Sequence, residues 1–332
     1  MKIHVENRSC FFFSFFVICF FLLIQTSHQQ NTTCPFQYIY HFGDGITDIG
    51  NSIRVLPFGP FLPSTRPPYG TTFPGRPTGR WSDGRVDVDY IDGVVETKIT
   101  FKGLLRDKYN KINQSRVISN ADCAVRLANS LIALGDIEGN DYGYPLAQGK
   151  SIQEVNTYVP FVIRALIEAA TELIRMGATR VVIAGSVPVG CYPYILTALQ
   201  TNNAADYDNL GCLKSVNDFI VSKNQLLQEA VTNLAAQFSN VGVYYGDLYG
   251  PVQTIIQESL VSGNMTLKAC CGIGGKYNYN SRRFCGSRGV PVCANPDEYI
   301  YWDGLHFTQE AYARYTDIVV QPFLPVLGCT SN

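Results

Sequence analysis

The sequence lacks an excess of charge of either sign. Lys and Arg number 26, Asp and Glu number 27, and charged residues make up only 16% of the 332-residue chain. Binding to nucleic-acid phosphates requires many uncompensated Lys and Arg side chains, so this balance excludes a nucleic-acid partner held by bulk charge. Apolar residues make up 46% of the chain, which is enough for a large core and excludes a disordered protein.

Histidine is scarce as well. The chain has four, and two of them, His4 and His28, lie in an N-terminal region that we expect to be removed or to border the cut. The remaining two, His41 and His306, are too few for a zinc site built from several imidazoles, so we predict no metal site. The search for a general base therefore reduces to two side chains.

A charge-free run of fifteen residues, Cys10–Ile24 (CFFFSFFVICFFLLI), lies near the N-terminus. It is too short for a membrane span, which needs about 20 apolar residues, but it fits the core of a signal peptide, which needs about 7–15. We predict a signal peptide over residues 1–28, a secreted protein, and no stable membrane span after cleavage. An uncleaved membrane anchor is the alternative.

Nine cysteines remain once Cys10 and Cys19 leave with the signal peptide. In an oxidising compartment they favour disulfides over zinc, and an odd number leaves at least one free or paired with another chain. The sequence does not determine which cysteines pair. Sequons at Asn31, Asn113 and Asn264 predict glycosylated surface positions if the chain is secreted.

Short apolar runs alternate with amphipathic stretches along the rest of the chain. The pattern predicts strands at 38–42, 130–134, 180–184 and 241–245, and helices at 151–177, 213–238 and 308–320. This alternation predicts an α/β fold, a parallel sheet with helices on both faces. No linker composition divides residues 29–332, so we expect one domain, with its ligand beyond the carboxyl ends of the strands.

Two regions interrupt the alternation. Residues 57–85 are dense in Pro and Gly, which predicts a long loop over the ligand-binding end of the sheet. Residues 264–297 contain four cysteines, which predicts an excursion held by disulfides rather than a zinc site.

A candidate base with its orienting carboxylate lies just before the last predicted helix. Asp303 precedes His306 by three residues, close enough on one turn to hold the second imidazole nitrogen, as in hydrolytic triads. The spacing alone is weak evidence, because a structural turn with a satisfied histidine has the same pattern. His41 lies within a predicted strand, which favours packing in the core or at an edge.

Five blocks give the sequence a resemblance to a known family. They read FGDGITDIGN (42–51), PYGTTFPGRPTGRWSDGR (68–85), GDIEGND (135–141), GSVPVGC (185–191) and YWDGLHFT (301–308). Over most of its length the chain resembles plant GDSL esterase/lipases of the SGNH hydrolase superfamily, and the segments LKACCGIGGKYNYN and CGSRGVPVCANP resemble the subgroup that includes sinapine esterase and acetylajmalan esterase. The resemblance implies a three-layer α/β/α, flavodoxin-like fold. It also implies hydrolysis of a small acylated plant metabolite without metal or cofactor, in the apoplast, the vacuole or another secretory compartment.

The match departs from the family at the nucleophile. In the family the first block reads GDS and its Ser attacks the ester carbonyl, but the matching residue here is Gly45, which has no hydroxyl. Thr47 and Ser52 are near in sequence, but we expect the next helix to direct them elsewhere. The match places the family's catalytic Asp and His at Asp303 and His306.

The oxyanion hole is altered too. The match assigns one donor to Asn140, whose alternative role is to cap the next turn, and the backbone N–H of Gly45 is a second candidate. The family's second block, a segment like NFAVGGAT whose Gly donates to the oxyanion, has no counterpart between Ile91 and Ser130. A deletion there also explains the odd cysteine, because Cys123 matches a family cysteine whose partner would lie in the missing segment.

Three interpretations stay open. The first is an esterase of weakened activity, because an oxyanion donor is worth about 2.7–4 kcal/mol and a missing nucleophile leaves only a residual rate. The second is an inactive member that binds an ester, a glycan or a partner protein in the old cleft. The third is a poorly folding, non-productive product of a variant transcript. The retained Asn140, Asp303 and His306 favour the first two, and the missing block favours the third.

Overall fold

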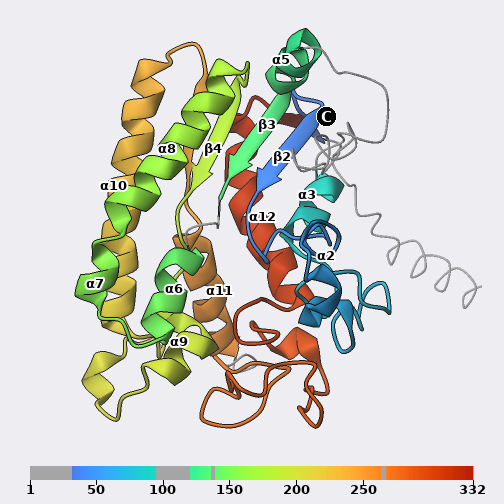
Figure 1. The fold of residues 1–332 in the computed structure, drawn as a ribbon, viewed down its shortest axis with the longest axis vertical. Helices are drawn as coiled ribbons and strands as arrows, with labels where there is room; N and C mark the ends of the chain where they lie inside the picture. The colour runs from blue at the N-terminus through green and yellow to red at the C-terminus, as the bar shows by residue number, and fades with distance from the viewer. Residues whose placement is uncertain (1–31, 95–119, 136–138, 263–266, 332) are drawn as a thin grey trace, which may run out of the picture.

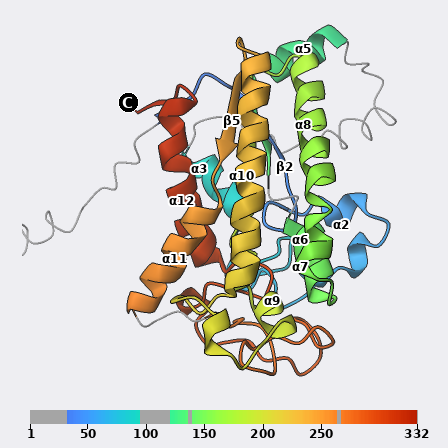
Figure 2. The same cartoon turned by 90° about the vertical axis from the view of Figure 1, so that its left-hand side faces the viewer.

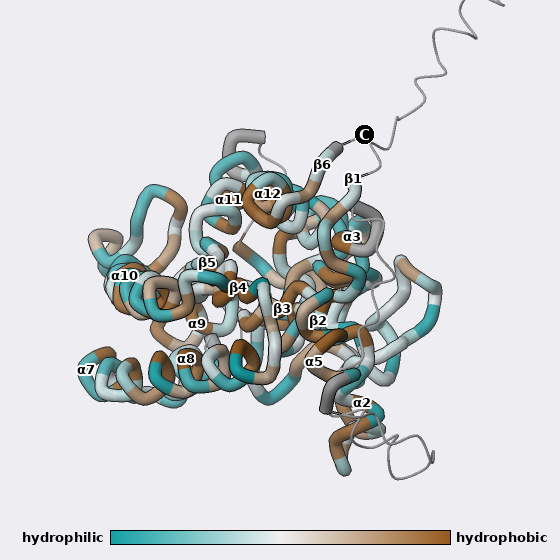
Figure 3. The backbone as a smooth tube through the Cα atoms, turned by 90° about the horizontal axis from the view of Figure 1, so that it is seen from above, coloured by the Kyte–Doolittle hydropathy of each residue, from teal (hydrophilic) through white to brown (hydrophobic). Residues whose placement is uncertain are grey.

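Four parallel strands form the sheet, in the order β2–β3–β4–β5 (Figures 1 and 3). The computed structural model describes residues 32–94, 120–135, 139–262 and 267–331. The strands are Tyr38–Phe42 (β2), Ser130–Leu134 (β3), Arg180–Ala184 (β4) and Gly242–Gly246 (β5), the last of which lies one residue beyond its prediction. The register pairs Ile39 with Leu131 and Val181 with Val243, so the apolar runs lie side by side, as expected for strands buried on both faces.

Helices cover both faces of the sheet, as the view from above shows (Figure 3). The principal ones are α3 (Asp87–Val94), α8 (Val159–Arg175), α10 (Lys214–Gln237) and α12 (Gln309–Val326). On one face α8 and α10 pack side by side (Figure 2), and their Leu166 and Leu227 share a core cluster with Ile132 of β3. On the other face Leu324 of α12 packs with Ile39 of β2. The predicted three-layer α/β/α fold is confirmed.

Shorter elements complete the described chain. The helices are α2 (Ser52–Val55), α5 (Asn120–Ala128), α6 (Gly139–Ala147), α7 (Ile152–Asn156), α9 (Pro193–Ala198) and α11 (Tyr249–Ser262), and 3₁₀ turns lie at Gly59–Phe61, Pro63–Thr65, Val189–Cys191, Ala204–Asp206 and Pro296–Glu298. The two ends of the described chain meet, because β1 (Thr32–Thr33) pairs antiparallel with β6 (Thr330–Ser331).

Proline explains one departure from the predicted helices. The single helix expected at 151–177 is two helices, α7 and α8. Backbone bonds from Thr157 to Glu154 and from Tyr158 to Val155 close α7 in a tight turn. Pro160 cannot donate a backbone hydrogen bond, which is tolerated in a first turn but not in a helix interior, so α8 starts beside it.

The last helix departs from its prediction in the opposite way, because it is longer than predicted. The last helix runs to Val326, past its predicted end at residue 320 and through Pro322 and Pro325. The prolines forfeit two backbone hydrogen bonds, but burial of Leu324 and Leu327 in the core beneath the helix offsets that loss.

Four disulfides link eight cysteines of the described residues: Cys34–Cys329, Cys191–Cys212, Cys270–Cys293 and Cys271–Cys285. The last two hold the segment predicted as a disulfide-stapled excursion. Cys123, on α5, is unpaired within the described residues, as the count of nine and the family match led us to expect.

Some predictions concern residues outside the described ranges. These are the signal peptide over 1–28, the sequons at Asn31, Asn113 and Asn264, and most of the interval 91–130, in which we predict that the family's second block is missing. Among the strands that the structure describes, β2 lies at one edge of the four-stranded sheet. None of the described helices is both long and apolar enough to cross a membrane.

Candidate functional site

A cleft at the carboxyl end of the sheet brings together the four predicted site residues. Gly45 follows β2 closely, Asn140 lies in the first turn of α6 after β3, and Asp303 and His306 lie in the loop that leads into α12. All four line a cavity of about 360 Å³. Parallel strands end at the same edge of a sheet, which is why segments far apart in the chain meet here.

Asp303 and His306 are hydrogen-bonded. His306 Nδ1 lies 3.0 Å from Asp303 Oδ1 and 2.9 Å from Oδ2. Asp303 Oδ1 also accepts the backbone N–H groups of Leu305 at 3.0 Å and His306 at 2.9 Å, and Gly304 closes the turn with φ of +98°, which glycine adopts without strain. The carboxylate thus holds both the backbone and the imidazole, and it leaves His306 Nε2 beside Gly45.

Two aromatic residues of the loop at 57–85 contact this pair, and sequence reasoning missed both. Tyr69 Oη donates a hydrogen bond of 2.7 Å to Asp303 Oδ2. The Trp81 ring stacks on the His306 ring, with centroids 4.9 Å apart and planes 24° apart. Both lie in a block that we used only for the family match. Aromatic residues in a loop otherwise rich in Pro and Gly were the available signal.

The disulfide-held excursion supports Tyr69. Tyr69 and Trp302 share a buried cluster with Cys270, Cys271 and Cys285. Their rings meet edge to face with centroids 6.1 Å apart, and the backbone N–H of Cys271 donates to the carbonyl of Trp302 at 2.6 Å. Since Trp302 directly precedes the candidate carboxylate, the disulfides brace the loop that carries it.

Burial and pairing act in opposite directions on the two charged groups. Burial favours a raised pKa for Asp303, but the charge of His306 and hydrogen bonds from His306 and Tyr69 hold that pKa below its usual value. Burial favours a lowered pKa for His306, but the charge and hydrogen bond of Asp303, with the charge of Asp44, raise that pKa above its usual value. The pair therefore stabilises an ionised Asp303 and a protonated His306.

Position 45 has no side chain, and His306 lies against its backbone. A Cβ atom added to Gly45 would overlap His306 Nε2, and it would lie 2.9 Å from His306 Cδ2 and 3.4 Å from Trp81 Cδ1. The imidazole thus occupies space that a side chain at this position would need.

Neither neighbouring hydroxyl takes the place of the missing nucleophile. The Ser52 hydroxyl donates to Asp48, and Thr47 lines a different cavity. This agrees with the expectation that both point elsewhere. The backbone N–H of Gly45 donates to no acceptor in the described part of the chain, which leaves it available to a ligand.

Asn140 is tied to Asp44, a residue of the first block that sequence reasoning did not single out. Asn140 Nδ2 donates to Asp44 Oδ2 at 2.6 Å, and the backbone N–H of Ile46 donates to Asp44 Oδ1 at 3.0 Å. An amide nitrogen carries two hydrogens, so Asn140 keeps one for a ligand. Burial raises the pKa of Asp44, against the lowering effects of Ile46, His306 and Asn140.

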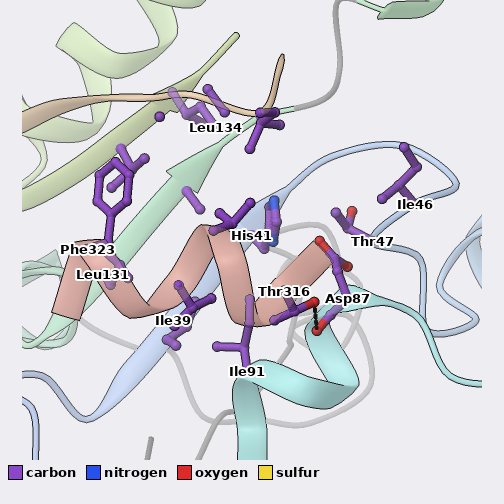
Figure 4. A pocket seen from close by; sticks show the side chains of 18 of the residues that line it. Ile39, His41, Ile46, Thr47, Asp87, Ile91, Leu131, Leu134, Thr316 and Phe323 are labelled. Carbon is purple, nitrogen blue, oxygen red and sulfur yellow. Dashed lines mark hydrogen bonds between the residues drawn. The ribbon is translucent and has the colours of Figure 1, made fainter. Parts of the chain in front are cut away.

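His41 is not part of the cleft. It lines a second cavity, of about 120 Å³, between the sheet and α12 (Figure 4). Its Nδ1 atom is buried and has no hydrogen-bond partner among the described residues, and burial lowers its pKa to about 4. Asp87 lines the same cavity, and burial raises its pKa well above the usual value. The surroundings agree with a packing role for His41.

The cleft thus combines a histidine oriented by a carboxylate with two hydrogen-bond donors near position 45. Such a histidine can take a proton from a hydroxyl or a water, and such donors can stabilise negative charge on a carbonyl oxygen. Within the described ranges, no group of three or more His, Cys, Asp or Glu side chains is placed to hold a metal ion.

Comparison with known proteins adds independent evidence. Residues 39–319 match the family described as GDSL-like Lipase/Acylhydrolase. Acetylajmalan esterase 2 of Rauvolfia serpentina is 35% identical over 359 aligned positions, which cover 95% of this chain and 98% of that protein. GDSL esterase/lipase At5g03980 of Arabidopsis thaliana is 36% identical over 326 positions, which cover 95% of this chain and 97% of that protein.

These matches extend over nearly the whole chain and include the strands and loops that form the cleft. They fit the parallel sheet, the helices on both of its faces and the position of the site at its carboxyl end. The chain therefore belongs to the GDSL-like lipase/acylhydrolase family of ester hydrolases.

Proposed function

We propose that this protein slowly hydrolyses an ester of a small acylated plant metabolite, with water in place of the missing serine. The observation that carries the proposal is the position of His306, oriented by Asp303 and lying with Nε2 against Gly45. Family membership supports ester hydrolysis. The lack of a hydroxyl at position 45 supports a weakened rate.

In the proposed reaction His306 Nε2 takes a proton from water as the water oxygen bonds to the ester carbonyl carbon. The carbonyl oxygen becomes an oxyanion, stabilised by the N–H of Gly45 and the amide of Asn140. When the intermediate collapses, the bond to the alcohol oxygen breaks and the His306 imidazolium returns its proton to that oxygen. The products are a carboxylic acid and an alcohol, and Asp303 stabilises the imidazolium throughout.

Two features make this reaction slow. A serine is held in place by the chain, whereas a water must first be bound and oriented. Hydrolases that lose a member of the triad keep an acceleration of about 10³–10⁴ over water. The missing second block removes a further donor, worth about 2.7–4 kcal/mol.

The lining of the cleft favours a small ester that contains rings. Five tyrosines contribute to it: Tyr69, Tyr144, Tyr192, Tyr194 and Tyr279. Tyrosine offers a flat apolar face together with a hydroxyl, which suits a ring-containing alcohol. The relatives named acetylajmalan esterase suggest an acyl group as small as acetyl.

Turnover of p-nitrophenyl acetate tests the proposal. We expect slow but repeated turnover by the wild-type protein, abolished by His306→Ala and lowered by about 10²–10³ in Asn140→Ala. Multiple turnovers must be counted, because the reagent also acylates surface side chains once. Equal steady-state rates for the wild-type protein and His306→Ala would contradict the proposal.

A non-catalytic binding role is the alternative, and the glycine at position 45 is the observation that favours it. The cleft would then retain an ester, a glycan or a partner protein without reaction. Under this alternative the assay gives no turnover, while ring-containing esters still raise the melting temperature of the wild-type protein.

The lengths of the alignments bear on a third interpretation, a non-productive variant. The three acetylajmalan esterases align over 357 to 359 positions, but At5g03980 aligns over 326 positions that cover 97% of its length, close to the 332 residues of this chain. A plant relative of similar length therefore exists, which favours a natural protein. Cooperative unfolding of the purified protein would support this view, and its absence would favour the non-productive variant.

Secretion is part of the proposal. The apolar run at Cys10–Ile24 and the four disulfides support entry into the secretory pathway. We expect the mature chain to begin between about residues 25 and 31 and to lose mass on deglycosylation. A chain from a plant secretory host that still begins at Met1 would refute it.

A further inference from the structure

An apolar prominence stands at the edge of the molecule beside α2. It consists of Val55, Leu56, Phe58 and Phe61, which are 52%, 38%, 56% and 76% exposed. Figure 3 shows the hydrophobic segment next to the α2 label at the outline of the protein. Single exposed apolar side chains are ordinary, but four within seven residues form a patch that indicates an interaction surface.

The exposure of these side chains is built into the fold. Backbone bonds from Leu56 to Ser52 (3.0 Å), from Gly59 to Leu56 (2.9 Å) and from Phe61 to Phe58 (2.9 Å) fold the segment back on α2. Gly59 is buried, and an added Cβ would lie 2.6 Å from the carbonyl oxygen of Ser52. Because the backbone packs inward, the large side chains are turned outward.

The exposed charges of the segment that carries the prominence are positive, while Asp48, at its start, is buried and accepts the Ser52 hydroxyl. No Asp or Glu occurs in the sequence from residue 49 through residue 82. Arg54 and Arg66 are exposed, and Arg66 Nη2 donates to the carbonyl of Phe61 at 2.9 Å, which holds its guanidinium beside the most exposed phenylalanine. Aromatic side chains flanked by cations are the pattern of a surface that inserts among anionic lipid headgroups.

The prominence continues into the rim of the cleft. Pro63, two residues beyond Phe61, lines the cleft, and Thr65 Oγ1 donates to the carbonyl of Pro60 at 3.2 Å. Phe284, which is also exposed, lines the same cleft. A surface that holds the prominence would therefore lie beside the entrance to the site.

We propose that the prominence docks this protein on an anionic lipid surface, with Phe58 and Phe61 among the acyl chains and Arg54 and Arg66 against the headgroups. Docking would let an ester dissolved in the membrane reach the cleft directly, and this consequence rests on the proposed function. The docking itself does not depend on hydrolysis, so the two proposals fail separately.

Sedimentation with lipid vesicles tests the docking without a substrate. The protein should bind vesicles of phosphatidylcholine with phosphatidylglycerol more tightly than vesicles of phosphatidylcholine alone. The preference should fall when the salt rises from 0.05 M to 0.5 M, because salt screens the arginines. Phe58→Ser combined with Phe61→Ser should weaken binding at least about tenfold, and Arg54→Gln should weaken binding only to the anionic vesicles.

The matched control is Phe161→Ser. Phe161 is 61% exposed on α8, well away from α2 in Figure 1, and its replacement should leave vesicle binding unchanged. Equal binding by the wild-type protein and the double variant would overturn the proposal, as would an equal loss with Phe161→Ser. A dimer of the wild-type protein that the double variant abolishes, without vesicle binding, would assign the patch to self-association instead.

Discussion

Two partly buried histidines in this protein differ in what surrounds them. Burial by itself lowers the pKa of both His41 and His306. In the cleft, Asp303 reverses that effect and the pKa of His306 rises. In the cavity on the sheet face, no described residue bonds the buried nitrogen of His41, and its pKa falls to about 4 (Figure 4).

The difference teaches that the partner, and not burial, makes a histidine a usable base. Asp303 fixes the ring of His306 and stabilises its charge, and the two disulfides behind Trp302 brace the loop that holds them. His41 has mostly apolar neighbours, which favour the neutral ring and offer no orientation. Substitutions around His306 or His41 test this difference between the two histidines.

The largest effect is expected on the rate of ester hydrolysis, when position 45 gains a hydroxyl that His306 can activate. Gly45→Ser should raise kcat/KM for p-nitrophenyl acetate by orders of magnitude, because Ser would stand beside Nε2 as a triad nucleophile. The gain should remain about 10²–10³ short of an intact relative, because we predict that the family's second block, with its donor, is missing. The imidazole must also shift, since the new Cβ would overlap Nε2.

Two controls isolate the chemistry of that variant. Gly45→Ala adds the same Cβ without a hydroxyl and should give no gain, and His306→Ala in the Gly45→Ser background should abolish the gain. A rate equal to that of an intact relative would show that our interpretation of the interval 91–130 is wrong. No gain in a variant whose circular dichroism is unchanged would favour the binding role.

The next effect is on stability at acid pH and concerns His41. Its folded pKa of about 4 lies below the ordinary value of 6.5, so the folded state loses stability as the pH falls from 6.5 towards 4. The loss amounts to about 3 kcal/mol of unfolding free energy by pH 4. His41→Leu should remove that loss, which urea unfolding at pH 7 and pH 4.5 would measure.

His306 affects the pH dependence of stability in the opposite direction, on the neutral and alkaline side. Its folded pKa is raised, so its contribution to stability is complete below pH 6.5 and is lost as the pH rises through the folded pKa. His306→Gln should flatten stability on the neutral and alkaline side and leave the acid side unchanged. An unaltered acid loss in His41→Leu would contradict the contrast.

A smaller effect on stability is expected when Asp303 keeps its contact with His306 but loses the hydrogen bond from Tyr69. Tyr69→Phe removes the hydrogen bond to Asp303 Oδ2, which should lower the unfolding free energy by about 1.5–3 kcal/mol and raise the pKa of Asp303. Tyr301→Phe is the control, because the Tyr301 hydroxyl is buried without a hydrogen-bond partner in the described part of the chain. Equal losses in the two variants would show that Tyr69 acts through packing alone.

The smallest effect concerns the free cysteine and tests whether the disulfides are closed as described. Labelling of the secreted protein under denaturing, non-reducing conditions should modify one thiol, on Cys123, because the other eight cysteines that the structure describes are paired. Peptide mapping locates the label, and reduction before labelling is the positive control. A label on Cys285 or Cys293 would mean that the excursion beside the cleft is not closed as described.

Local patterns predicted the strands almost to the residue. The runs at 38–42, 130–134 and 180–184 are apolar and end at glycine or polar residues, so their signal lies within the strand itself. Spacing also predicted the contact of Asp303 with His306, because three residues on one turn suffice. Helix ends were less predictable, since Pro160 breaks one helix while Pro322 is carried within another.

Contacts between distant segments were beyond the sequence pattern. Tyr69 and Asp303 are 234 residues apart, and no local signal links them. The pairing of the cysteines and the stacking of Trp81 on His306 depend in the same way on how the loops meet.

The sequence by itself determined that position 45 carries no hydroxyl and that only His41 and His306 lie beyond residue 28 as candidate bases, because these are properties of the residues present. Only the tertiary structure decided which histidine gains a carboxylate, and that its Nε2 lies against Gly45. The physical reason is that the pKa and orientation of a buried imidazole depend on burial and on neighbours, and neighbours from distant segments meet only when the chain folds.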